Sequence, residues 1–60
     1  MSPTVISLEQ IDLEIAVAFV ALGVARTAEA HCPSGENAAA VAAAERAVDR
    51  LLDARIAAAR

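Results

Sequence analysis

His31 and Cys32 are adjacent in the chain, and they are the residues with nucleophile or soft-ligand character. A cysteine reacts or binds metal as the thiolate, which needs a base or a positive charge held beside it in fixed geometry. Pro33 stiffens this segment, but neighbours in sequence seldom reach one another, and no oxyanion-stabilising motif accompanies them. We therefore interpret both as loop residues and keep a redox or metal site at His31 and Cys32 as the lesser alternative.

Carboxylates offer a second possible route to metal chemistry. Metal sites in helical bundles combine inward Glu residues with a Glu-x-x-His pair on one helix. Glu29 and His31 are only two apart and diverge on a helix, and Glu14 fits an edge position, solvated or paired with Arg. One cysteine forms no intrachain disulfide, and no zinc-type Cys or His spacing is present. The sequence predicts no catalytic residue, no cofactor and no metal site, and therefore no enzyme.

The first of two expected helices has a clear start signal. Ser7 and Gln10 fit a capping box, in which the Ser7 hydroxyl accepts from an orphan amide and Gln10 reaches back to the cap residue. Residues 1–6 are then an extended lead-in, with Ile6 as a hydrophobic staple. We expect this helix to run over about residues 8–30.

Pro33 ends the first helix, because proline disfavours helical geometry at the preceding residue and has no amide hydrogen to donate. Ser34 can cap a second helix over about residues 36–60. A connection over residues 31–35 has the usual length for antiparallel neighbours. The predicted fold is a single all-α domain covering residues 1–60, folded as an antiparallel two-helix hairpin.

The first helix carries apolar side chains on two opposite sides. Its middle is uncharged from Ile15 to Ala25. At about 100° per residue, one stripe contains Ile11, Ile15, Phe19 and Leu22, and the opposite stripe contains Leu13, Val17, Val20 and Val24. The helix therefore needs two partners, and these eight residues are the predicted interface. Gly23 lies inside the helix, so we expect another backbone to pack closely there.

The second helix is apolar on one side only. Val41, Val48, Leu51 and Leu52 gather there, with Ala40, Ala44 and Ala47 beside them, while Glu45, Arg46, Asp49, Arg50 and Asp53 lie opposite. Arg46 with Asp49 and Arg50 with Asp53 are expected to pair along the helix. Arg55 projects near the apolar side, where it covers the hydrophobic edge or meets an acidic residue of the first helix.

One stripe of the first helix remains bare after this pairing, whichever stripe the second helix covers. Soluble monomers seldom expose a continuous apolar strip of several turns. Two hairpins that bury their bare stripes against each other form a four-helix bundle, with the first helices central. A chain of 60 residues is also marginally stable alone, which favours oligomerisation. The direction of dimer packing stays open.

The negative net charge of the chain limits the kinds of molecule that it is expected to bind. The net charge of −3 and the pI near 4.8 argue against nucleic-acid binding and against an anionic membrane surface. The apolar run is shorter than the about 20 residues needed to cross a bilayer. The sequence predicts a cytoplasmic, non-enzymatic protein–protein interaction module, a regulator, adaptor or assembly subunit acting as a homodimer. The alternative is an obligate small subunit, or an inhibitor of the antitoxin kind, that masks a larger protein.

Overall fold

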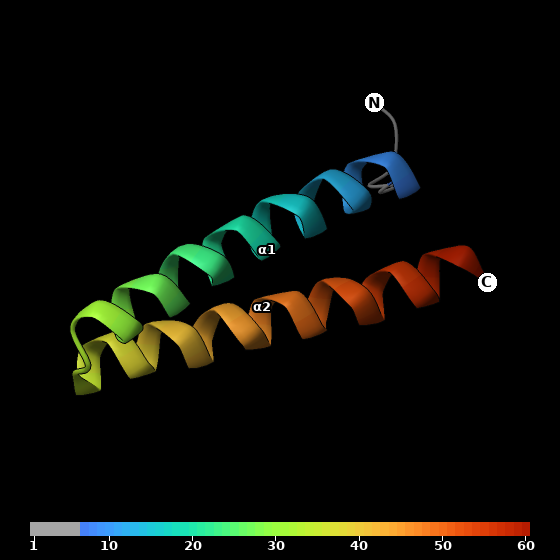
Figure 1. Ribbon diagram of the computed structural model, residues 1–60. Coiled ribbons are helices and arrows are strands. Elements are labelled where there is room, and N and C mark those ends of the chain that lie inside the picture. Colours follow the sequence, from blue (N-terminus) through green and yellow to red (C-terminus); the bar gives the residue numbers. More distant parts are fainter. Residues whose placement is uncertain (1–6) are drawn as a thin grey trace, which may run out of the picture.

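A computed structural model describes residues 7–60, so the lead-in at residues 1–6 and the predicted staple at Ile6 lie outside the described residues. Two helices, α1 (Leu8–His31) and α2 (Gly35–Ala59), make up the described chain, which contains no strand. They run antiparallel, with the loop at one end and both helix ends leading to the termini at the other (Figure 1). The predicted all-α hairpin is confirmed. Relative to the expected bounds, α1 extends one residue further and α2 begins one residue earlier.

The start of α1 follows the capping signal in part. The Ser7 hydroxyl accepts a 3.1 Å hydrogen bond from the Gln10 amide, as expected for an N-cap serine. The Gln10 side chain, however, donates to Glu14 Oε2 at 3.0 Å instead of reaching back to Ser7. The reciprocal half of the capping box was therefore wrong, because a carboxylate one turn ahead offers Gln10 a charged acceptor.

The loop between the helices is held by one amide side chain. Ser34 caps α2 by accepting from the Asn37 amide at 3.0 Å, as predicted. The Asn37 side chain reaches across the loop and donates to the carbonyls of Cys32 at 2.7 Å and Ala28 at 3.4 Å. The Cys32 carbonyl lies beyond the last turn of α1, so the Asn37 side chain supplies its partner and links the end of α1 to the start of α2.

The two helices meet along matching lines of residues. Most of the buried and half-buried positions recur at alternating steps of four and three residues, along Ile11, Ile15, Ala18, Leu22, Ala25 and Glu29 on α1 and Asn37, Val41, Ala44, Val48, Leu51 and Arg55 on α2. This is the spacing of helices that pack side by side over their whole length. Ala42 and Ala47 are half-buried beside this line on α2. Among the described residues only Ile11, Leu22 and Val48 are buried, at 3%, 6% and 5% exposure. The hydrophobic core is therefore one layer of side chains thick.

Residue size along these lines accounts for the shape of the hairpin. Near the loop the facing residues include Ala25 and Ala44, and near the open end they include Ile11 and Leu51. Small side chains let two helix axes approach, and larger ones separate them. The helices accordingly lie close together at the loop and diverge toward the chain ends (Figure 1).

Two ion pairs link the helices across their edges. Arg55 Nε lies 2.6 Å from Asp12 Oδ1, and Arg26 Nη2 lies 3.2 Å from Glu45 Oε2. The first pair confirms that Arg55 meets an acidic residue of the first helix. The pairs predicted within α2, Arg46 with Asp49 and Arg50 with Asp53, are not formed in the described chain. All four side chains of the observed pairs are about half exposed, so each pair contributes modestly.

The thin core makes individual core residues important for stability. We expect Leu22→Ala to lower the free energy of unfolding by about 2–3 kcal/mol, since it removes a buried side chain and leaves a cavity. The control Ile56→Ala removes an aliphatic side chain that is 56% exposed, and we expect a change below about 1 kcal/mol. Urea denaturation followed by circular dichroism, at one fixed chain concentration, measures both. Equal losses would contradict the assigned packing.

Candidate interaction surface on α1

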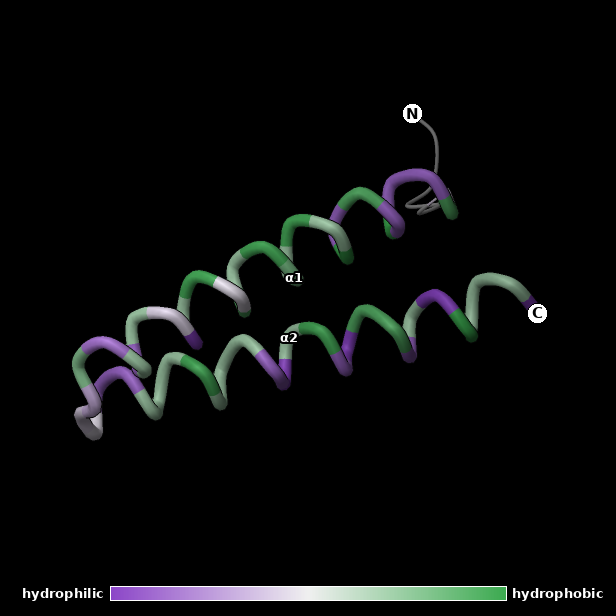
Figure 2. The backbone as a smooth tube through the Cα atoms, viewed as in Figure 1, coloured by the Kyte–Doolittle hydropathy of each residue, from purple (hydrophilic) through white to green (hydrophobic). Residues whose placement is uncertain are grey.

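The side of α1 that faces away from α2 is apolar and exposed. Its large side chains are Leu13, Val17, Val20 and Val24, with exposures of 60%, 61%, 68% and 66%. We call these four residues the outer stripe. Hydrophobic residues recur on successive turns through the middle of α1, whereas α2 alternates more regularly with hydrophilic ones (Figure 2). The stripe that contains Ile11 and Leu22 therefore faces α2, and the outer stripe is not covered by α2.

The outer stripe has the same spacing as the buried line of α1. Leu13, Val17, Val20 and Val24 follow the four-three-four steps of the line from Ile11 to Leu22, moved along the chain by two residues. Two residues correspond to roughly 200° around a helix, so the two lines lie on opposite sides. α1 therefore has two surfaces suited to side-by-side helix packing, and α2 covers one of them.

A shallow hollow extends the outer stripe toward the loop. Its lining residues are Val20, Gly23, Val24, Thr27, Ala28 and His31. The Thr27 hydroxyl donates to the Gly23 carbonyl one turn earlier at 2.9 Å, so this polar group is satisfied within α1. Thr27 and His31 also continue the four-three spacing beyond Val24.

Gly23 differs from its expected role within the hairpin. No atom outside the local helix backbone lies within 4 Å of the place where a Cβ would be. The expectation that another backbone packs there is therefore wrong for α2, which lies on the other side of α1. Gly23 instead leaves a gap in the side chains of the outer surface.

The eight predicted interface residues divide between three locations. Ile11 and Leu22 are buried against α2, and Ile15 is half-buried there. The outer stripe contains Leu13, Val17, Val20 and Val24. Phe19 belongs to neither group, because it is 51% exposed at the edge where α1 meets α2.

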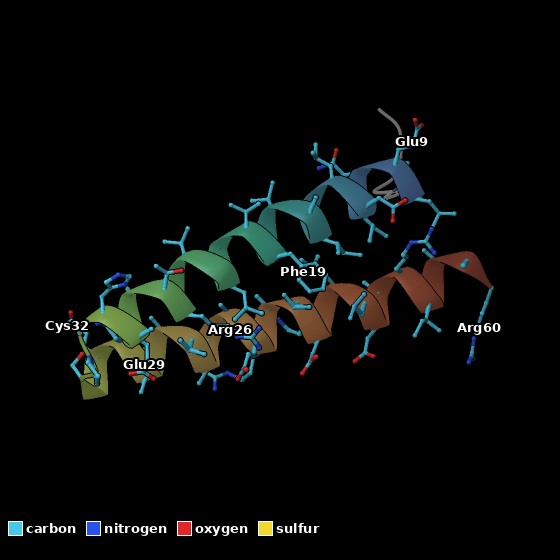
Figure 3. The ribbon with its side chains drawn as sticks, viewed as in Figure 1. Glu9, Phe19, Arg26, Glu29, Cys32 and Arg60 are labelled. Carbon is cyan, nitrogen blue, oxygen red and sulfur yellow. The ribbon has the colours of Figure 1, made fainter. Side chains whose placement is uncertain are left out.

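Phe19 and Leu52 form part of a groove along one edge of the hairpin. The groove is lined by Phe19, Leu22, Arg26, Glu45, Val48, Asp49 and Leu52. Phe19 and Arg26 extend from α1 toward α2, whereas Glu9 points away from it (Figure 3). Leu52 was expected on the covered side of α2 but is 40% exposed, because the covered line passes through Val48, Leu51 and Arg55. The edge is partly apolar and charged on both helices.

His31 and Cys32 lie at the loop end, and backbone groups hold them both (Figure 3 labels Cys32). Nδ1 of His31 lies 2.9 Å from the Thr27 carbonyl, which can only accept, so Nδ1 donates. Cys32 caps α1, its amide donating to Ala28 and its carbonyl accepting from Asn37. The thiol is exposed, and within residues 7–60 no hydrogen bond joins it to the imidazole and no group of three metal-binding side chains occurs.

Electrostatics differ between the two ends of α1. Glu9 and Glu14 lie exposed near its start, while its end carries Arg26, His31 and the half-buried Glu29. Asp12 forms an ion pair with Arg55. The Asp12 carboxylate raises the pKa of Arg55 above its ordinary value, mainly through the hydrogen bond that it accepts and secondly through its negative charge. An arginine is already charged at any physiological pH, so this pair does not act as a pH switch.

Some contributors to these surfaces were missed from the sequence. Thr27 and His31 could have been found, since they repeat the four-three spacing of the outer stripe. Asn37 and the Arg26–Glu45 pair could not, because they depend on which residues of two helices come together across the loop.

No family model, no curated protein and no solved structure matched the chain in our comparisons. Neither helix in residues 7–60 combines the length and the apolarity that a membrane-spanning segment requires. The outer stripe and the edge groove are therefore the features from which a function can be inferred.

The geometry at the loop generates a prediction for Cys32. Its thiol is exposed and forms no disulfide, so we expect Cys32→Ser to leave helical content and oligomeric state unchanged. Elemental analysis of the purified protein should find less than one metal ion per ten chains. Stoichiometric metal that is lost in the Cys32→Ser variant would instead support a metal site.

Proposed function

We propose that this chain is a non-enzymatic protein–protein interaction module that works as a homodimer, joined through the outer stripe of α1. The observation that carries the proposal is the exposure of four large aliphatic side chains in one line on α1, each 60% exposed or more. Their spacing matches that of the covered line against α2, so a second helix of the same kind fits them.

The free energy available from burying the outer stripe supports an association of moderate strength. Complete burial of a Leu or Val side chain is worth about 1.5–3 kcal/mol, so eight partly exposed side chains from two chains supply roughly 8–16 kcal/mol. Association itself costs about 4–15 kcal/mol in lost freedom. A dimer at micromolar concentration needs a surplus of about 8 kcal/mol. This value lies within the range that these figures give, and it requires most of the available burial, so each of the four residues matters to the dimer.

The proposed dimer is layered. Because α2 and the outer stripe lie on opposite sides of α1, the order across the assembly is α2, α1, the partner's α1 and the partner's α2. This arrangement keeps the first helices central and the second helices flanking, as the sequence predicts. The contact is isologous, meaning that the same surface of both chains is used, so the assembly closes as a dimer.

A second candidate function is that of an obligate small subunit or inhibitor of a larger protein. Phe19, Leu52 and Ile56 favour it, because they are 51%, 40% and 56% exposed away from the outer stripe. Phe19 lies roughly 120° around α1 from that stripe. In this role the chain would present the edge groove to a different protein, either as a dimer or with its outer stripe covered by the partner.

Charge substitution on the outer stripe tests the dimer. We expect Val17→Glu to shift the purified chain from dimer to monomer at micromolar concentration, weakening association at least 100-fold, because two carboxylates would be buried in an apolar contact. Multi-angle light scattering after size exclusion measures this shift, and circular dichroism reports any accompanying loss of helix.

The matched control is Ile56→Glu, which places the same charge at a similarly exposed aliphatic residue of α2. It should leave the dimer intact. Ile15→Glu is unsuitable, since Ile15 lies between α1 and α2 and its substitution would disturb the hairpin itself. A well-folded wild-type monomer at micromolar concentration would refute the proposed function.

A further inference from the structure

We infer that the two outer stripes pack antiparallel, with Leu13 of one chain opposite Val24 of its partner and Val17 opposite the partner's Val20. This inference rests on the homodimer proposed above and adds the direction and register of packing. The occupant of the outer stripe is a second copy of this chain, and the charged residues beside the stripe favour one direction of packing over the other.

Both directions of packing are compatible with the lengths of the elements. The outer stripe is centred between Ala18 and Phe19, and the midpoint of α1 lies between Phe19 and Val20. An antiparallel pair in this register therefore overlaps along nearly all of α1 in both chains. The length of α1 does not distinguish parallel from antiparallel packing. The distinction comes from the residues that flank the outer stripe.

Parallel packing brings carboxylates together. Glu9, Ala16 and Gly23 flank the outer stripe on one side, and Glu14, Ala21 and Ala28 flank it on the other. In a parallel pair, a residue on the first flank meets the residue about five positions later on the partner's second flank. Glu9 then lies beside the partner's Glu14, and symmetry makes this contact twice. Like charges placed opposite each other across a contact disfavour that arrangement.

Antiparallel packing removes this conflict, because each flank then meets the same flank of the partner. Glu14 lies beside the partner's Ala21, and Ala16 lies beside the partner's Gly23. The acidic start of each α1 falls next to the end of the partner's α1, which bears Thr27 and His31. This places Glu9 and Glu14 of the two chains at opposite ends and opposes the two helix dipoles.

The open space at Gly23 is consistent with this register. Nothing lies within 4 Å of its missing Cβ, and the residue brought opposite it is the small Ala16. Two residues of this size let the helix backbones approach along that flank. The valines of the stripe can then contact one another without a bulky residue holding the helices apart.

Disulfide trapping tests the direction directly. In a Cys32→Ser background, Leu13→Cys and Val24→Cys are prepared as separate single variants. Each is equilibrated alone in a glutathione redox buffer, and the two are also mixed in equal amounts. Intact-mass spectrometry then distinguishes the mixed disulfide from the two like disulfides, and light scattering records the oligomeric state before oxidation.

The antiparallel dimer predicts the mixed disulfide in at least five-fold excess over the like disulfides, with little crosslinking of either variant alone. Efficient crosslinking of each variant alone, in a chain that is a dimer, would overturn the antiparallel direction and leave the homodimer standing. A monomer by light scattering would instead overturn the proposed function itself, so the two failures are distinguishable.

Charge reversal at Glu9 tests whether repulsion between flanking carboxylates sets the antiparallel direction. Glu9→Lys converts the like-charge contacts of the parallel pair into opposite-charge contacts, so the excess of mixed disulfide should fall several-fold. The matched control is Glu36→Lys, which reverses the acidic residue in the first turn of α2, away from the outer stripe. It should leave the excess unchanged, and an equal fall in both variants would refute the role of the flanking charges.

Discussion

The structure depends on one constraint: α1 is apolar on two opposite sides, and the described chain contains one other helix to cover it. α2 covers the line that contains Ile11 and Leu22, and their burial is nearly complete. The opposite line, from Leu13 to Val24, remains largely exposed. A helix that is hydrophobic around most of its circumference belongs in the interior of an assembly, because exposed apolar area of that extent is costly in water. In the proposed dimer, the second chain would cover this exposed line.

The remaining features of the fold serve to hold α1 in place. The alanines near the loop allow close approach of the helices, Asn37 joins the end of α1 to the start of α2, and Arg55 meets Asp12 near the open end. Because the hydrophobic core is only one side chain thick, these polar contacts and the helix caps form a larger share of the stability than in a bigger domain. The same thinness leaves α1 exposed along its outer side, so the structural weakness and the proposed binding surface have one origin.

His31 and Cys32 are the most reactive pair of neighbours in the sequence, but in the structure both make hydrogen bonds that hold the end of α1 and the loop. The imidazole donates to Thr27 through Nδ1, and the main chain of Cys32 takes part in ending α1. Within residues 7–60 no hydrogen bond joins the thiol to the imidazole, and no group of three metal-binding side chains occurs. The chemistry that the described surface does offer is association: aliphatic side chains in a line, small residues beside them, and acidic residues at one end. The proposed dimer and its direction use these three properties together.

The sequence by itself determined the two helices, their caps at Ser7 and Ser34, and the division of α1 into two apolar stripes, because helical periodicity and capping are local properties of the chain. It did not determine which stripe α2 covers, since both stripes have suitable spacing and similar hydrophobicity. Only the tertiary structure decided this. Packing against α2 buried the Ile11 line, left Phe19 and Leu52 at an edge, and brought Asn37 onto the carbonyls of the loop. These outcomes depend on the rotation of one helix relative to the other, which is set by the fit of side chains between them and is not encoded in the spacing along either helix alone.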